Sequence, residues 1–185
     1  MSIETIREQL PDYARDLRLN LGSVLTPQGA PGLSEKMIAS VALATAIAAR
    51  NPRLVEAVEA WARPQLEDAE LDAARAAAAI MGMNNIYYRF LHLVEDPEYQ
   101  RLPARLRMNV IGNPGIDKLD FELLSLAVSA VNGCGMCVVS HERKLRESGV
   151  ERERIQSAVR IASVMHAVAG VLDYVDPAAE RQAAA

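Results

Sequence analysis

Residues 120–142 read DFELLSLAVSAVNGCGMCVVSHE and contain the only two cysteines of this 185-residue chain, Cys134 and Cys137. Before the cysteines, apolar residues recur with helical spacing, at Leu123, Leu126, Ala127 and Ala130. Asn132-Gly133 is a typical helix break, and a second helix is predicted from about Cys134 to about Glu147, where Ser148-Gly149 ends it. We therefore expect a helical hairpin with its corner at residues 132–133 and a CxxC motif at the start of the second helix.

The hairpin predicts which side chains lie beside the cysteines. Glu122 lies ten residues before Asn132 and His141 lies nine after it, so at ~1.5 Å per residue each is roughly 14 Å from the corner. The two side chains should therefore face each other, and His141 is also one helical turn from Cys137. A carboxylate beside an imidazole beside a thiol forms a proton relay. Ser125 and Ser129 lie on the same or an adjoining stripe as Glu122. We expect Glu122, His141 and the two thiols to line one cleft.

Three other interpretations of this segment stay open. Cys134, Cys137 and His141 resemble part of a zinc site, although a structural site needs four ligands and the chain has no second CxxC. Both cysteines would also be compatible with an inert core, where free cysteine is common. Glu122 would be compatible with an exposed helix surface, the usual place for glutamate. The position of the cysteines at a helix start argues against an inert core role, because the helix dipole and the free backbone N–H groups stabilise a thiolate there.

The composition favours an all-α protein. Half of the residues are hydrophobic, 30 are alanine and only eight are aromatic, which suits closely packed helices better than a β-sandwich. The formal charge of −4 and the lack of a basic stripe argue against a nucleic-acid partner. No uninterrupted apolar run reaches the roughly 20 residues of a membrane span, and the N-terminus lacks a secretory signal pattern. We expect a cytoplasmic protein, in which a lone CxxC is typically redox-active.

The remaining sequence predicts further helices around the hairpin. An N-terminal helical segment with a break at Pro11 precedes a turn-rich loop at 26–32, and Asp96-Pro97 and Pro103 predict irregular chain. Gly82 and Asn84-Asn85 are expected to bend or interrupt the helix that contains them. The predicted helices cover residues 2–21, 34–50 (capped by Ser34), 53–62, 66–91, 119–131, 134–147 and 151–175.

We interpret the chain as a single domain, residues 1–185, built as a helical bundle. A weak repeat begins at Leu71-Asp72 and again at Leu119-Asp120, each opening an apolar helix that meets Asn and Gly about a dozen residues later. It divides the domain into an N-terminal half of about 1–105, a C-terminal redox half of about 106–177 and a frayed tail, 178–185. His166 is expected as a buried or interface residue, and His92 as a surface residue near a helix end.

Several motifs together resemble one known family. MGMNN (81–85), RMNVIGNPGI (107–116), FELLSLAVSAVNGC (121–134) and CVVSHE (137–142), together with the N-terminal SIETIREQLPDYARDLRLNL, are similar to the alkyl hydroperoxidase D (AhpD) family. This family belongs to the carboxymuconolactone decarboxylase-like superfamily. The resemblance covers nearly the whole chain, and it implies an all-α fold of two duplicated halves that assembles as a trimer or a multiple of it.

The resemblance also implies an antioxidant oxidoreductase. Family members reduce the peroxiredoxin AhpC through their CxxC and are re-reduced by dihydrolipoamide, the external electron donor, carried on a lipoyl-bearing component of a 2-oxoacid dehydrogenase. They also reduce alkyl hydroperoxides directly and weakly. No bound metal, flavin or nicotinamide is implied, and the sequence has no GxGxxG motif for one.

The family's site residues match this chain position by position. By resemblance, Cys137 is the nucleophile that passes through a sulfenic acid, and Cys134 is the proton donor and resolving thiol that closes a Cys134–Cys137 disulfide. His141 and Glu122 match the relay histidine and glutamate. Some members carry a histidine directly before the second cysteine, where this chain has Met136. Relay details from those members therefore do not transfer to this position.

Two other functions compete with the thiol peroxidase. A carboxymuconolactone decarboxylase-like enzyme would share the fold but would not need a CxxC. A non-enzymatic, zinc-stapled interaction module would use the cysteines as ligands.

Overall fold

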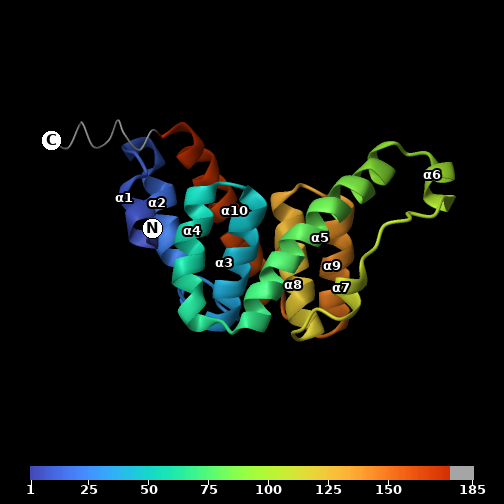
Figure 1. The fold of residues 1–185 in the computed structure, drawn as a ribbon, viewed down its shortest axis with the longest axis horizontal. Coiled ribbons are helices and arrows are strands. Elements are labelled where there is room, and N and C mark those ends of the chain that lie inside the picture. Colours follow the sequence, from blue (N-terminus) through green and yellow to red (C-terminus); the bar gives the residue numbers. More distant parts are fainter. Residues whose placement is uncertain (176–185) are drawn as a thin grey trace.

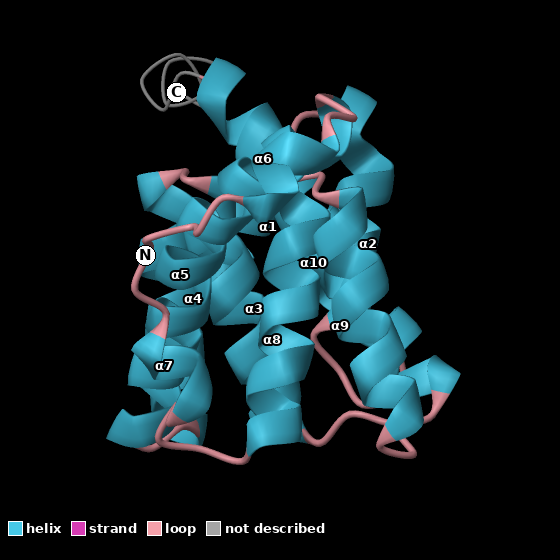
Figure 2. Ribbon diagram, turned by 90° about the vertical axis from the view of Figure 1, so that its right-hand side faces the viewer, coloured by secondary structure: helices cyan, strands magenta, loops and turns pink. Residues whose placement is uncertain are grey.

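The computed structural model describes residues 1–175, and all regular structure in them is helical (Figure 2). Short 3-10 turns cover Asp12–Ala14 and Arg63–Gln65. The predicted tail, 178–185, and the last two residues of the predicted redox half, 176–177, lie outside the described residues. The helices are α1 (Ile3–Glu8), α2 (Arg15–Val24), α3 (Glu35–Ala49), α4 (Pro52–Ala62), α5 (Asp68–Leu93), α6 (Pro97–Arg101), α7 (Asn109–Gly112), α8 (Lys118–Val131), α9 (Gly135–Glu147) and α10 (Arg152–Tyr174). The all-α prediction is confirmed.

Helices α3, α5, α8 and α10 form the centre of the bundle. α10 packs against α2, α3 and α8, and α5 crosses between α3 and the α8–α9 hairpin. In Figure 1, α1 to α4 lie at one end of the molecule and α8 and α9 at the other, with α5 running diagonally between them. Many of the alanines of α3 and α5 face this core and let the helices approach closely, for example Ala42, Ala44 and Ala77, which are completely buried.

Local signals place most helix ends where the sequence predicts them. The Ser34 hydroxyl accepts a hydrogen bond from the Met37 backbone and begins α3. Asn51 caps α4 in the same way and also donates to Asp173 at the end of α10. Gly149 has a φ of 84°, the left-handed conformation expected of a residue that ends a helix.

Two predictions about the middle of the chain are wrong. α5 runs without interruption through Gly82 and Asn84-Asn85, because the Asn85 side chain bonds to α8 and to its C-cap Asn132 and does not compete for the backbone of its own helix. The weak repeat therefore differs between its two copies, since only the second has a break. Residues 97–101, expected to be irregular, form the short helix α6, which Asp96 begins by accepting a bond from the Glu98 backbone. The division into two halves stays a prediction.

α10 is long and apolar enough to cross a bilayer by length and composition alone. In this structure 56% of its most apolar stretch is buried inside the chain, where it packs as the core helix described above. The apolar composition of α10 therefore has a sufficient explanation in the core.

Asn85 joins α5 to the corner of the hairpin. It is completely buried, its Nδ2 donates to Ser129 Oγ at 2.9 Å, and its Oδ1 accepts from Asn132 Nδ2 at 2.9 Å. One side chain of α5 thereby satisfies polar groups on both sides of the last turn of α8.

Replacing Asn85 with alanine should lower the free energy of unfolding by about 2–4 kcal/mol, because the buried Ser129 hydroxyl and the partly buried Asn132 amide lose their partner. Chemical denaturation of the variant would measure the loss. The exposed Asn113 offers a control, since Asn113→Ala should change stability by less than about 0.5 kcal/mol. A stability loss in Asn85→Ala no larger than in the control would contradict this role.

Candidate functional site

The two cysteines lie at the corner between α8 and α9. Asn132 ends α8, Gly133 takes a φ of 68°, and Cys134 is the N-cap of α9, where its Sγ accepts a hydrogen bond from the Cys137 backbone at 3.3 Å. The sulfur atoms of Cys134 and Cys137 are bonded to each other. The sequence expectation of a CxxC disulfide at a helix start is therefore confirmed, and the structure describes the oxidised state.

The two cysteines differ in their access to solvent. Cys134 is completely buried, whereas Cys137 is 6% exposed and lines a cavity. An incoming molecule can therefore meet the sulfur of Cys137 but not that of Cys134.

Glu122 and His141 face each other across the hairpin, as the residue arithmetic predicts. His141 Nδ1 and Glu122 Oε1 are 2.6 Å apart. Glu122 is 5% exposed, so the alternative of an exposed helical glutamate is wrong. α8 holds the carboxylate inside the bundle, and α9 brings the imidazole to it.

Lys144 is a third member of this group that sequence reasoning missed. Its ammonium donates a hydrogen bond to the other carboxylate oxygen of Glu122, and its own side chain is largely exposed. The signal was present in the sequence: Lys144 lies eleven residues after Gly133, and it is one helical turn from His141. The same hairpin arithmetic that pairs Glu122 with His141 therefore also reaches Lys144.

The Glu122 carboxyl stays ionised despite its burial. Burial by itself favours the neutral form, but the hydrogen bonds from His141 and Lys144 outweigh it, so the pKa of Glu122 lies below its ordinary value. An ionised carboxylate only accepts hydrogen bonds, so Nδ1 of His141 must be the donor. The neutral imidazole then carries its free lone pair on Nε2.

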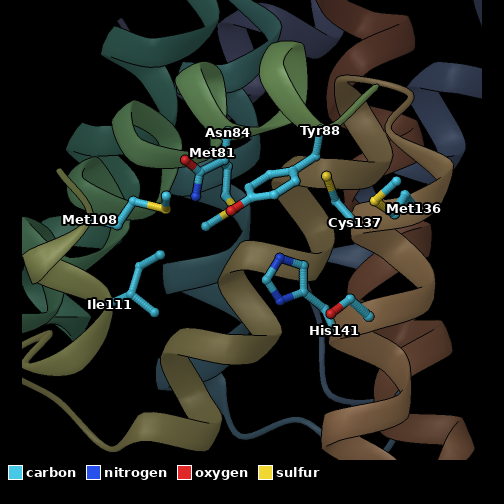
Figure 3. A pocket seen from close by; sticks show the side chains of 9 residues that line it. Met81, Asn84, Tyr88, Met108, Ile111, Met136, Cys137 and His141 are labelled. Carbon is cyan, nitrogen blue, oxygen red and sulfur yellow. The ribbon is translucent and has the colours of Figure 1, made fainter. Parts of the chain in front are cut away.

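The cavity beside Cys137 has a volume of about 350 Å³ and lies between α5, α7 and α9. Figure 3 shows the imidazole of His141 on one side and side chains of α5 on the other. We call it the Cys137 cavity. Its lining residues are Met81, Asn84, Tyr88, Met108, Ile111, Met136, Cys137, Ser140 and His141.

The structure brings the four predicted site residues together in layers and not in one open cleft. Cys137 and His141 line the cavity, Glu122 lies behind His141, and Cys134 is buried beneath Cys137. Ser125 and Ser129, which the sequence places on the same or an adjoining stripe as Glu122, do not line the cavity. Both are buried: Ser125 donates to its own helix backbone, and Ser129 accepts from Asn85.

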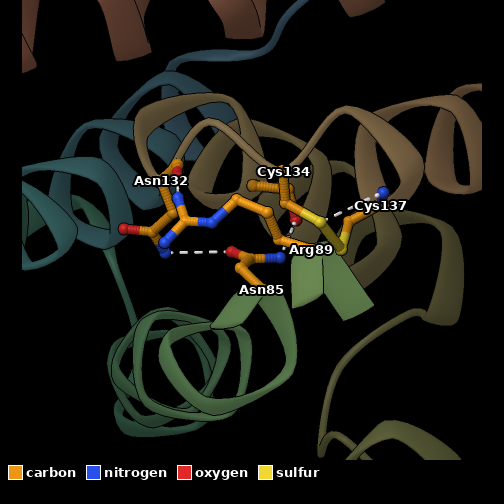
Figure 4. Close-up of a disulfide and its surroundings, with 6 residues drawn as sticks. Asn85, Arg89, Asn132, Cys134 and Cys137 are labelled. Atoms are coloured by element: carbon orange, nitrogen blue, oxygen red, sulfur yellow. Dashed lines mark hydrogen bonds between the residues drawn. A yellow bond between two sulfur atoms is a disulfide. The ribbon is translucent and has the colours of Figure 1, made fainter. Parts of the chain in front are cut away.

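A second set of hydrogen bonds supports the corner from α5 (Figure 4). Arg89 Nη1 donates to the backbone carbonyl of Asn132 at 2.8 Å, one turn of α5 beyond Asn85. The Cys134 backbone N–H donates to the carbonyl of Ser129 at 3.1 Å. Ser129 therefore links Asn85, which bonds to its hydroxyl, with the first cysteine. Sequence reasoning missed these residues because their partners are more than 40 positions away.

The other two histidines lie away from this site. His166 is exposed in this chain and lines a separate surface cavity with Ala130 and Ser163, so it is not a buried residue, and its place at an interface stays a prediction. His92 is exposed in the last turn of α5, as expected. Among residues 1–175, no group of three or more His, Cys, Asp or Glu side chains is arranged to hold a metal ion.

Comparison with known proteins agrees with this arrangement. Residues 97–180 match the carboxymuconolactone decarboxylase family model. A protein of Rhodospirillum centenum named alkyl hydroperoxide reductase AhpD is 58% identical over 94% of this chain and 91% of its own length. Proteins of the same name from Gluconacetobacter diazotrophicus and Streptomyces avermitilis are 57% and 53% identical, each over 94% of this chain and over 93% and 96% of their own lengths. Identity at this level over nearly the full length shows that the chain belongs to the AhpD family.

Proposed function

We propose that this protein is a thiol-dependent alkyl hydroperoxide reductase that works through Cys134 and Cys137. The observation that carries the proposal is the position of Cys137, which lines a cavity together with His141, whose Nδ1 is bound by the ionised Glu122. The names of the relatives support the same activity. The overall reaction converts a hydroperoxide and two thiols into an alcohol, water and a disulfide.

The first step is proton removal from Cys137 by His141. Nε2 of the imidazole takes the thiol proton and leaves a thiolate, the reactive form of cysteine. Glu122 accepts the Nδ1–H bond, so it holds the ring in place and stabilises the imidazolium that forms. Lys144 keeps the carboxylate ionised for this role. The start of α9 adds its dipole to the stabilisation of the thiolate.

The second step breaks the O–O bond. The thiolate sulfur attacks the oxygen that carries hydrogen, forming an S–O bond, and the electron pair of the O–O bond leaves on the oxygen attached to carbon. The imidazolium of His141 returns its proton to that oxygen, which departs as an alcohol. Cys137 is then a sulfenic acid.

The third step closes the disulfide. The Cys134 thiol attacks the sulfenic sulfur and displaces the hydroxyl group as water. Because Cys134 is the N-cap of α9, its sulfur already lies within bonding distance of Cys137. The burial of Cys134 keeps competing thiols away from the sulfur that must perform this step.

Return to the dithiol requires an external dithiol, because each turnover consumes two electrons. In our proposal dihydrolipoamide, carried on a lipoyl-bearing 2-oxoacid dehydrogenase component, exchanges with the disulfide and leaves as lipoamide. The reduced protein then passes electrons to an AhpC-type peroxiredoxin by the same exchange chemistry. Both partners act at Cys137, the accessible sulfur, and both suit a cytoplasmic location.

The proposed assembly is a homo-oligomer, a trimer or a multiple of it, formed through the outer face of α5 and the arm that carries α6. This arm projects from the bundle (Figure 1). Several large apolar side chains are exposed here, including Leu93 at 71% and Leu102 at 60%. A shallow apolar groove continues the same surface and is lined by Met83, Ile86, Tyr87, Phe90 and Leu106. Contiguous apolar surface of this kind typically marks a protein interface.

Cys137→Ser should abolish both peroxide turnover and trapping of a sulfenic acid by dimedone, because it removes the attacking sulfur. Cys134→Ser should leave a sulfenic acid that dimedone traps, since nothing resolves it. Mass spectrometry of the labelled protein measures both results. Trapping that survives in Cys137→Ser and disappears in Cys134→Ser would reverse the assignment.

Glu122→Gln should lower peroxidase turnover by roughly 10–10³-fold, because the imidazolium loses its negative partner. Unfolding temperature should change little, and the pH midpoint for alkylation of Cys137 should rise. Adding His141→Phe should cost little more than His141→Phe alone, since residues of one relay are not additive. Glu147→Gln, an exposed change on α9, serves as the control. Normal turnover in Glu122→Gln, or additive losses in the double variant, would exclude the relay.

Dilution to nanomolar concentration should leave the wild-type protein assembled, as mass photometry would measure. Ile86→Glu should dissociate it to 20.2 kDa subunits, because it places a charge in the apolar face. Leu19→Glu, which is equally exposed but lies on α2, should have no effect on assembly. An active wild-type monomer would disprove the proposal of an obligate oligomer.

A further inference from the structure

The Cys137 cavity is much larger than the smallest peroxide requires. Its volume of about 350 Å³ is in the usual range for small-molecule sites, whereas hydrogen peroxide has only two heavy atoms. Most of its wall is apolar and comes from Met81, Met108, Ile111 and Met136. Methionine side chains adapt to the shape of what they contact. Such a wall suits a compact organic group next to the reacting sulfur.

Asn84 is a buried polar residue in this wall, and its amide oxygen has a hydrogen bond still to make. It is only 5% exposed, and its amide oxygen has no hydrogen-bond partner among the described residues. A buried polar atom without a partner is unusual and costs stability. Figure 3 shows the carboxamide on the α5 side of the cavity, across from His141.

The neighbouring asparagine shows that the missing bond is specific to Asn84. Asn85 is completely buried and has partners at both ends of its amide, Ser129 and Asn132. Asn84 therefore does not share the structural role that Asn85 fulfils. In Figure 3 the amide nitrogen of Asn84 lies nearer the cavity than its oxygen does. A carboxamide can turn about its last side-chain bond, which exchanges the two atoms and brings the oxygen to a molecule in the cavity.

We propose that Asn84 is the residue that binds and orients the hydroperoxide, with the organic group of the substrate packed against Ile111 and the cavity methionines. This inference rests on the proposed function and adds the site at which the substrate is recognised. The preferred substrates are compact alkyl or aryl hydroperoxides, in preference to hydrogen peroxide.

Asn84 would act on the oxygen that the sulfur attacks. Its amide oxygen accepts the hydrogen of the O–O–H group, which turns the O–O bond away from Asn84 and toward the wall that holds the organic group. When the thiolate of Cys137 forms the S–O bond, this oxygen keeps its hydrogen and becomes the sulfenic hydroxyl. The same hydrogen bond therefore persists from substrate to intermediate. The oxygen attached to carbon leaves with the electron pair and takes its proton from His141.

The test measures how fast pre-reduced protein is oxidised by cumene hydroperoxide, tert-butyl hydroperoxide and hydrogen peroxide in stopped flow, with thiol loss as the signal. Asn84→Leu keeps the side-chain size and should lower the rate constant for all three peroxides by about tenfold or more. Alkylation of Cys137 by iodoacetamide should stay within about twofold of wild type, because this reagent does not need the hydrogen bond.

A wall variant tests the organic group separately. Ile111→Ala should lower the rate constant for cumene hydroperoxide by about tenfold and leave hydrogen peroxide unchanged. Ile116→Ala is the matched control, since Ile116 is also a partly buried isoleucine packed on the core but does not line the cavity.

The outcomes separate this inference from the proposed function. If no hydroperoxide oxidises the wild-type protein, the proposed function fails and the inference fails with it. If the wild type reacts and Asn84→Leu reacts equally fast, only the inference is overturned. A parallel fall in alkylation would show that Asn84 acts on the thiolate and would also overturn it. The inference is also overturned if the variants slow only re-reduction by dihydrolipoamide, because the cavity would then bind the dithiol and not the hydroperoxide.

Discussion

The ionised carboxylate of Glu122 inside a helical bundle is the constraint on which the rest of the site depends. A buried carboxylate is costly unless charged or hydrogen-bonding groups surround it. Here the imidazole of His141 and the ammonium of Lys144 meet its two oxygens, and both come from α9. The requirement to pair Glu122 therefore fixes how far α9 slides along α8. Because Cys137 is one turn before His141 on α9, the pairing of Glu122 also sets the position of the Cys137 sulfur.

The second support of the site comes from α5. It contacts the corner between α8 and α9 and not the Glu122–His141 pair. Asn85 and Arg89 lie one turn apart and bond to the last turn of α8 and to the carbonyl of Asn132. α5 also supplies the wall of the cavity opposite His141. One continuous helix therefore both fixes the position of the cysteines and shapes the space in front of them. An interruption at Gly82, which the sequence suggested, would separate these two tasks.

The residues that sequence analysis placed correctly are those related by local geometry. The contact of Glu122 with His141 follows from the rise per residue of a helix and from the break at Asn132-Gly133, because the two residues lie nearly the same number of positions from that break. The helix cap at Ser34 is equally local. Errors arose where a partner far away in the chain decides the outcome. Asn85 by itself predicts a helix break, but its bonds to Ser129 and Asn132 make it compatible with a continuous helix.

The different burial of the two sulfurs also depends on tertiary structure, and in the proposed mechanism it assigns a different role to each cysteine of the motif. Spacing alone makes Cys134 and Cys137 neighbours with equal standing. The N-cap position turns Cys134 inward, where the hydrogen bonds from α5 to the corner enclose it, and leaves Cys137 at the cavity. A molecule that enters the cavity therefore meets Cys137 first, and Cys134 stays enclosed behind it. In the proposed mechanism, this difference in access sets the order of the two sulfurs, before any difference in their intrinsic reactivity is considered.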